Sequence, residues 1–215
     1  MLQKLVIIGA GGFGREVQWL VERMNQQEKT WNLMGYIDDG MEKGTIINGL
    51  PVLGSINDLI KVEEKVAVAC AIGTSATRKK VLDRLKNNSQ MEFPNLIDPS
   101  VLVSGLVCLG KGIIICAGSV LTVNITLEDF VIINLDCTIG HDSKLSRFVT
   151  LYPSVNISGN VFVGEETELG TGTQIIQGMK VLNNSIVGAG AVVVKDIPSK
   201  CTAVGSPAKP IRFYE

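Results

Sequence analysis

Histidine is almost absent from this chain of 215 residues, which carries only His141. A single histidine excludes the zinc sites that several imidazoles build, and no CxxC pair offers a replacement. The cysteines are also odd in number, which argues against a disulfide framework. We therefore expect no metal site, and we expect the cysteines to be small buried residues. These five are Cys70, Cys108, Cys116, Cys137 and Cys201.

Charge of one sign and long apolar runs are missing as well. The 20 basic and 21 acidic residues leave a net charge of −1, so no polybasic face is available for nucleic acid or an anionic membrane. No apolar stretch approaches the roughly 20 residues of a membrane helix, and the N-terminal run reaches its glycines before it is long enough for a secretory signal. With 46% hydrophobic residues, we expect a globular, cytoplasmic protein.

A repeat of six residues, a hexad, fills the C-terminal half. Every sixth residue from Ile97 to Val193 is Ile, Leu or Val, seventeen in succession. A period of six fits neither a helix nor a plain strand, but it fits short strands that turn corners with one inward side chain on each side. Three sides, one hexad each, close one coil, so residues 96–198 are predicted to form a triangular parallel β-helix. Five glycines just after inward aliphatics suit its tight corners: Gly110, Gly140, Gly164, Gly170 and Gly188.

The repeat also places the one histidine. His141 stands two residues after the inward Ile139, so its ring should lie outside the prism near a corner. Gly159 follows three hexads later and should lie one coil above, at about 4.8 Å along the axis. Asn134, seven residues before His141, should also lie near the prism surface. A structural role in a turn or in an asparagine ladder explains this residue about as well as a functional role does.

These residue types could supply a general base and an oxyanion donor. Imidazole titrates near neutral pH and can take a proton from an incoming hydroxyl or amine. Asp142 could orient the ring, although neighbouring side chains in an extended chain often point to opposite sides. An open amide at Gly159 could stabilise the oxyanion by typically ~3 kcal/mol. A simple corner glycine explains Gly159 equally well.

A short α/β unit is predicted for residues 1–95. A buried strand at 4–8 leads into the GxGxxG sequence of residues 9–14 and a helix from about 15 to 24, a pattern that suits a phosphate at a helix N-terminus. A second strand, 33–37, ends in Asp38 and Asp39, where a carboxylate could hold a ribose or sugar hydroxyl. A third, 66–72, leads to Gly73. About 90 residues are too few for two mononucleotide-binding halves, which disfavours NAD binding.

The chain resembles the hexapeptide-repeat acyltransferases, in particular the sialic-acid O-acetyltransferases and nucleotide-amino-sugar N-acetyltransferases of bacterial surface-glycan pathways. The resemblance implies a short Rossmann-like parallel sheet followed by a left-handed parallel β-helix, a C-terminal tail at 199–215 and a homotrimer. The segments that carry it are 9–16, 36–39, 71–73, Asn134, 139–142, 158–161 and 205–209.

The resemblance further implies which residues bind the two substrates. His141 would be the general base, with Asp142 and Gly159 beside it. The nucleotide-sugar acceptor would be held by Gly11, Gly12, Phe13, Gly14, Asp38, Asp39, Gly73 and Asn134. Acetyl-CoA, the co-substrate, would lie against Thr150, Gly172, Gly188, Ala189, Gly190, Pro207 and Lys209. Many relatives carry a second histidine where Thr150 stands, and some carry one in place of Phe13.

Two alternatives to acetylation of an amine stay open. The same machinery would acetylate a sugar hydroxyl, as on sialic acid. A non-catalytic nucleotide-binding scaffold would use the glycine loop alone, and it would bind nucleotide without binding CoA.

Overall fold

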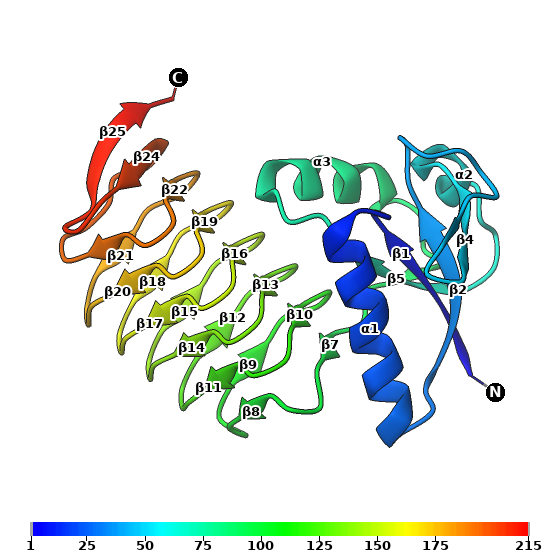
Figure 1. Ribbon diagram of the computed structural model, residues 1–215, viewed down its shortest axis with the longest axis horizontal. Coiled ribbons are helices and arrows are strands. Elements are labelled where there is room, and N and C mark those ends of the chain that lie inside the picture. Colours follow the sequence, from blue (N-terminus) through cyan, green and yellow to red (C-terminus); the bar gives the residue numbers. More distant parts are fainter. Residues whose placement is uncertain (1, 215) are drawn as a thin grey trace. The chain divides into compact units, whose positions relative to one another are not determined.

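The computed structural model describes residues 2–214, and its contacts divide the chain between Pro99 and Ser100 into two compact units. The first unit is a six-stranded α/β sheet, and the second is a parallel β-solenoid (Figure 1). This confirms the predicted fold class. Within the described residues, no helix has the length and apolar character needed to cross a bilayer.

The first unit is built around a sheet with the strand order β3-β4-β2-β1-β5-β6. All its pairs are parallel except β3 with β4, which form an antiparallel hairpin and make the sheet mixed rather than purely parallel. Its elements are β1 (Gln3–Ile8), α1 (Gly12–Gln27), β2 (Trp31–Ile37), β3 (Ile46–Ile47), β4 (Leu50–Gly54), α2 (Ile56–Ile60), β5 (Val66–Cys70), α3 (Ser75–Leu85) and β6 (Met91–Glu92), followed by β7 (Leu96–Ile97).

The order of this sheet follows from its sequence. β1 is a continuous apolar run, as expected of a central parallel strand that is covered on both faces, and Leu5 and Ile7 are fully buried. Strand β1 passes through the glycine loop into α1. A Cβ atom at Gly14 would overlap the carbonyl group of Gly9, so only glycine lets the first turn of α1 lie this close to the end of β1.

The solenoid consists of two-residue strands, each paired in parallel with the strand three hexads further on, such as Val120 with Thr138 and Thr138 with Asn156. The inward aliphatics from Ile115 to Val193 are at most 3% exposed, which confirms the six-residue period. The strands are β8 (Leu102–Val103), β9 (Cys108–Leu109), β10 (Ile114–Ile115), β11 (Val120–Leu121), β12 (Thr126–Leu127), β13 (Ile132–Ile133), β14 (Thr138–Ile139), β15 (Lys144–Leu145), β16 (Thr150–Leu151), β17 (Asn156–Ile157), β18 (Phe162–Val163), β19 (Glu168–Leu169), β20 (Gln174–Ile175), β21 (Lys180–Val181), β22 (Ile186–Val187) and β23 (Val192–Val193).

The corners of the coils differ in detail from the prediction. Every sixth residue from Gly112 to Gly190 has a positive φ, whether it is glycine or not, and this left-handed residue makes the bend. The glycines expected at the corners lie two residues earlier. Their role is close approach, because a Cβ atom at Gly140 would lie 2.6 Å from the backbone carbon of Ser158 on the next coil.

Strands β24 (Cys201–Val204) and β25 (Lys209–Phe213) form a hairpin that extends the sheet beyond β22. Four of the five cysteines are buried, as expected, but Cys108 is exposed, which contradicts the expectation for that residue. Burial raises the pKa of the Cys70 thiol to about 12 and that of Cys137 to about 11. These two thiols stay protonated at neutral pH and are poor nucleophiles.

Candidate active site

His141 lies where the sequence predicts it, on the outside of the solenoid just after β14. Its side chain is 52% exposed. The backbone around it is fixed on both sides, because the Gly140 amide donates to the Ile157 carbonyl (2.8 Å) and the His141 carbonyl accepts from the Asn160 amide (2.7 Å). The ring therefore projects from a rigid corner.

Asp142 contacts the imidazole ring directly. Its φ of 59° is the left-handed bend of this corner, and the bend turns its side chain to the same side as that of His141. His141 Nδ1 and Asp142 Oδ2 are 2.8 Å apart, and Asn124 Nδ2 donates to Asp142 Oδ1 at 3.2 Å. These bonds, first that to His141 and then that to Asn124, hold the pKa of Asp142 below its ordinary value. An ionised Asp142 favours the tautomer with its proton on Nδ1 and leaves Nε2 free as a base.

Gly159 lies against the His141 ring, as the three-hexad register predicts. A Cβ atom at Gly159 would lie 2.5 Å from Cε1 and closer still to Nε2. Among residues 2–214, no acceptor takes the Gly159 N–H, nor those of Val123 and Gln177 at the same corner of neighbouring coils. A free amide is thus a property of this corner, and what distinguishes Gly159 is the imidazole next to it.

Asn134 and the expected acetyl-CoA residues of the late coils lie along a different corner. Asn134 follows β13, so the β14 side of the triangle separates it from His141. Its side-chain oxygen accepts from the Leu135 amide (2.8 Å), and the residue is only 9% exposed. The structure therefore does not bring Asn134 to the histidine within one chain.

The same corner, two and three coils above Asn134, holds most of the expected acetyl-CoA contacts. The Gly190 amide donates to the Thr171 carbonyl (2.8 Å), and the Ala208 amide donates to the Val192 carbonyl (2.8 Å), which places the turn around Pro207 beside this corner. Thr150 is 1% exposed in β16, on the sheet that leads to this corner. The expected residues grouped here are Gly172, Gly188, Ala189, Gly190 and Pro207, with Lys209 exposed at the start of β25.

In the first unit, the glycine loop leaves the N-terminus of α1 open. Gly11 is the N-cap residue, no side chain caps the helix, and the first turn carries no acidic residue. Gly11 and Gly12 are exposed, and Phe13 is half-buried. Free amides and the positive end of a 16-residue helix favour an anion at this position.

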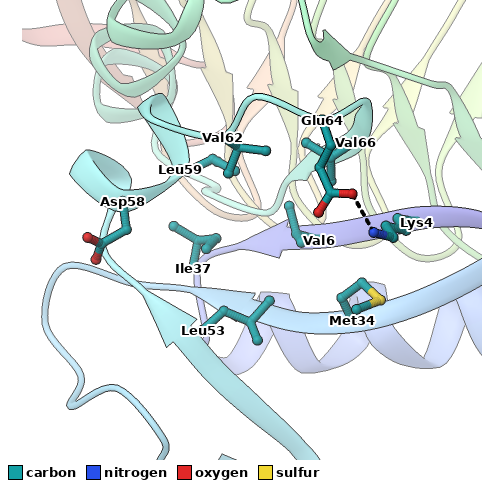
Figure 2. Close-up of a pocket in the computed structure, with 10 residues that line it drawn as sticks. All are labelled: Lys4, Val6, Met34, Ile37, Leu53, Asp58, Leu59, Val62, Glu64 and Val66. Carbon is teal, nitrogen blue, oxygen red and sulfur yellow. Dashed lines mark hydrogen bonds and ion pairs between the residues drawn. The ribbon is translucent and has the colours of Figure 1, made fainter.

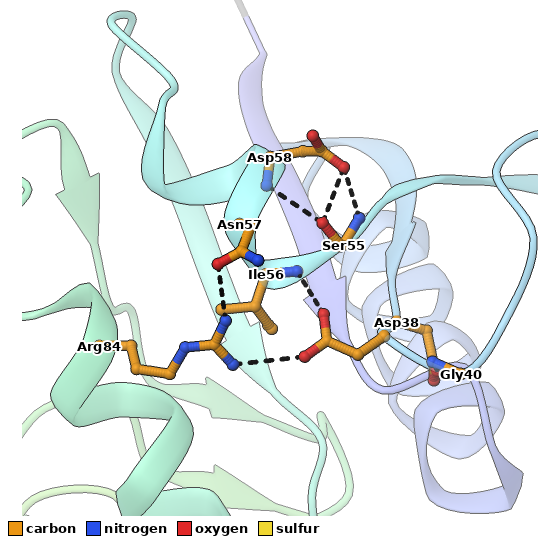
Figure 3. Close-up of polar contacts among 8 residues, drawn as sticks. Asp38, Gly40, Ser55, Ile56, Asn57, Asp58 and Arg84 are labelled. Atoms are coloured by element: carbon orange, nitrogen blue, oxygen red, sulfur yellow. Dashed lines mark hydrogen bonds and ion pairs between the residues drawn. The ribbon is translucent and has the colours of Figure 1, made fainter.

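The two aspartates after β2 hold backbone groups. Asp38 Oδ2 accepts from the Ala10 amide and Oδ1 from the Gly40 amide, both at 2.8 Å. Asp39 Oδ1 accepts from the Ile56 amide (2.7 Å), and Oδ2 pairs with Arg84 Nη1 (3.3 Å), as Figure 3 shows for Ile56 and Arg84. The carboxylates expected to hold a sugar hydroxyl therefore also brace the glycine loop and the start of α2.

A crevice of about 270 Å³ lies beside these aspartates, at the carboxyl ends of β1, β2 and β5. This is where open α/β sheets bind their ligands. Gly73 borders the region, and its carbonyl accepts from the buried Arg78 (2.9 Å). Arg84 and Ile56 escaped the sequence analysis because only the folded chain shows that they reach Asp39. The lining residues are Ile8, Gly9, Ile37, Asp38, Asp39, Gly40, Ile56, Ile72, Thr77 and Val81.

A second cavity, of about 180 Å³, lies between strands of the same sheet and the segment from α2 to β5 (Figure 2). Its walls are apolar, with Val6, Leu53 and Leu59 among them. The charged groups at its edge are engaged, since Lys4 pairs with Glu64 at 2.6 Å and Asp58 caps α2. It offers no convergent polar groups for a ligand. Across residues 2–214, no three His, Cys, Asp or Glu side chains gather in a way that could hold a metal ion.

Comparison with known proteins gives matches over the whole chain. The family described as the PglD N-terminal domain matches residues 4–85. The acetyltransferase domain of PglB from Neisseria gonorrhoeae FA1090, solved with acetyl coenzyme A, is 34% identical with a TM-score of 0.90, and the match covers 98% of this chain and 100% of that one. PerB from Caulobacter crescentus, solved with CoA and GDP-perosamine, is 31% identical with a TM-score of 0.87, covering 98% of each chain.

Curated sequences agree with the solved structures. The GDP-perosamine N-acetyltransferase of Escherichia coli O157:H7 is 27% identical over 96% of this chain and 95% of its own length. A shorter match, 48% identical over 61 residues, spans only 27% of a putative acetyltransferase of Schizosaccharomyces pombe.

The contact between Gly159 and the imidazole predicts that Gly159→Ala displaces the ring. The added methyl group overlaps Nε2 and Cε1, and the ring, at the end of an exposed side chain, moves more easily than the stacked backbone. We expect the imidazole NMR signals, which can come only from His141, to shift while the melting temperature changes by less than about 3 °C.

The matched control is Gly105→Ala, at the same corner three coils below. A Cβ atom there meets no atom within 4 Å. Its imidazole signals should coincide with those of the wild-type protein. Unshifted signals in Gly159→Ala would mean that the glycine and the ring are not in contact in solution.

Proposed function

We propose that this chain acetylates the amino group of a nucleotide-linked amino sugar in glycan biosynthesis. It belongs to the family of acetyl-CoA-dependent nucleotide-sugar N-acetyltransferases. The observation that carries the proposal is the group formed by His141, Asp142 and Gly159. It places a free imidazole nitrogen next to a glycine with an unpaired amide. These are the two elements that acyl transfer from a thioester requires.

The reaction then proceeds by general base catalysis. The amino group of the acceptor attacks the thioester carbonyl carbon, and His141 Nε2 takes the proton that the nitrogen loses as the C–N bond forms. The Gly159 N–H donates to the oxyanion of the tetrahedral intermediate. The C–S bond breaks, and the CoA sulfur leaves with the proton returned by the imidazolium. The ionised Asp142 stabilises that imidazolium while it exists.

The two substrates are assigned to the two sets of expected binding residues. We place the nucleotide diphosphate at the glycine loop, residues 11–14, with its nucleoside in the crevice beside Asp38 and Asp39. Acetyl-CoA lies along the corner that carries Gly172 and residues 188–190, with Lys209 close to it. Because His141 occupies a different corner of the same chain, a complete site needs that corner of a neighbouring chain, which supports a homotrimer. The protein acts in the cytoplasm, the compartment that supplies acetyl-CoA.

The two alternatives differ in what supports them. A hydroxyl acceptor would use the same groups, but both a solved and a curated relative, with near-complete coverage, are associated with GDP-perosamine, an amino sugar. A nucleotide-binding scaffold would need no imidazole beside a free amide. Binding of CoA by the purified protein, measured by calorimetry, separates an enzyme from such a scaffold.

The general-base role predicts the effect of His141→Ala. Acetyl-CoA is offered with GDP-, UDP- and dTDP-linked amino sugars and with matching sugars that carry a hydroxyl in place of the amine, and release of the CoA thiol is followed. We expect turnover with an amino sugar and a loss of about 10²- to 10⁴-fold in kcat for His141→Ala. Binding of CoA should be retained. Equal rates for the variant and wild type would contradict the role, and turnover confined to hydroxyl sugars would establish O-acetylation.

The network around Asp39 predicts a separate effect on the acceptor. Arg84 contacts Asp39 (3.3 Å) and Asn57 (2.9 Å), and Asp39 holds the amide of Ile56, which lines the crevice. We expect Arg84→Ala to raise the KM for the nucleotide sugar by about two- to fivefold, as suits an exposed ion pair. The KM for acetyl-CoA and kcat should stay unchanged. The control is Lys80→Ala, at an exposed position on the same helix. A lower kcat with unchanged KM would place Arg84 elsewhere in the mechanism.

A further inference from the structure

We propose that Asn124 is a positioning residue for the general base and acts on His141 only through Asp142. The proposal rests on the proposed function, since it assumes that His141 takes the proton. Asn124 stands three hexads before Asp142, one coil below it, and its side-chain amide bonds to the Asp142 carboxylate rather than to the ring. It is not part of the segments that carry the family resemblance.

The geometry joins the three side chains in a line. Asn124 Nδ2 donates to Asp142 Oδ1 (3.2 Å), and Asp142 Oδ2 meets His141 Nδ1 (2.8 Å), so each carboxylate oxygen has one partner. Asn124 and Asp142 have nearly the same left-handed φ, 57° and 59°. Two residues with the same backbone conformation, one coil apart, project their side chains in the same direction. The register of the solenoid thus brings the amide to the carboxylate.

The chemistry of the amide suits this position. A carboxylate held only by the ring can rotate about its last bond, and the ring then loses its fixed orientation. A second hydrogen bond stops this rotation. Because the donor is neutral, it does not cancel the negative charge of Asp142, which an arginine or lysine would do. The charge stays available for the imidazolium that forms during catalysis.

The segments next to Asp142 at this corner offer no other charged group that could hold its carboxylate. The neighbouring segments of the same corner, residues 104–107, 122–125, 158–161 and 176–179, contain no titratable side chain. Lys144, the nearest cation along the chain, pairs with Glu128 at 2.7 Å. Within this corner, Asp142 is therefore the charged group next to the ring, and its pKa is lowered by the bonds to His141 and Asn124.

Asparagine also has a purely conformational reason to stand at a left-handed corner. Asn184 has the same φ of 57° at another corner, is exposed, and serves as the matched control. Glycine preserves the bend and removes the amide. We expect Asn124→Gly to lower kcat roughly 3- to 10-fold, the range for one lost hydrogen bond, while the KM for acetyl-CoA is unchanged. Asn184→Gly should match wild type.

Asn124→Asp tests the link without any substrate. It keeps the shape and tolerates the bend, but it places a second carboxylate beside Asp142. Negative charge near the ring favours the imidazolium. We therefore expect the NMR titration midpoint of His141, the sole imidazole in untagged protein, to move to higher pH than in wild type. The acid limb of kcat/KM should move with it. Asn184→Asp should move neither.

A double mutant separates positioning from a general structural role. In an Asp142→Asn background, Asn124→Gly should cause no further loss of kcat, because the group through which it acts is gone. Losses that add, or a wild-type rate for Asn124→Gly, would overturn the proposal. So would an unmoved His141 titration in Asn124→Asp. If the wild-type protein transferred no acetyl group, the proposed function would fail, and the NMR titration would still decide whether Asn124 is coupled to His141.

Discussion

The parallel hydrogen bonds between the strands of successive coils fix the height and corner of every residue in the solenoid. Each strand has only two residues and cannot cover its own apolar face, so each coil depends on the coils above and below it. A slip of one residue would replace buried aliphatics with charged residues at several positions, such as Lys144, Glu168 and Lys180, which disfavours any other register. Side chains on the outside are therefore carried by a backbone that cannot shift, and an exposed histidine can serve as a precisely placed base.

The bends between the sides are the second constraint, and the proposed active site makes use of one. Each corner from Gly112 to Gly190 has a residue in the left-handed region, which costs about 1–2 kcal/mol for residues other than glycine and is easiest for asparagine and aspartate. Phe130 and Phe148 also accept this conformation and stack at 5.5 Å. At the His141 corner the bent residue is Asp142, and the bend is what points its carboxylate at the ring. The strain of the corner is thus part of the proposed catalytic geometry.

The six-residue period was enough to predict the solenoid, the exposure of His141 and the position of Gly159, because all three depend only on counting along a regular coil. The period alone does not predict the bond between His141 and Asp142, since extended strands separate neighbouring side chains and only the left-handed φ brings these two together. Asn124 was missed for the same reason. In the first unit, the motif predicted the glycine loop, but the engagement of Asp38 and Asp39 with the Ala10, Gly40 and Ile56 amides depends on loop conformations that the sequence does not show.

The candidate active site arises where one coil differs in sequence from the other coils at the same corner. At the corner that His141 occupies, successive coils carry Gly105, Val123, His141, Gly159 and Gln177, and from Val123 upward the next residue makes the left-handed bend. Only one coil combines an imidazole with an acidic residue at the bend, a glycine above and an asparagine below. Loss of the glycine would close the space beside Nε2, and loss of the acid would free the ring. The proposed catalytic role of His141 therefore depends on the register of three adjacent coils, because no single coil supplies all four groups.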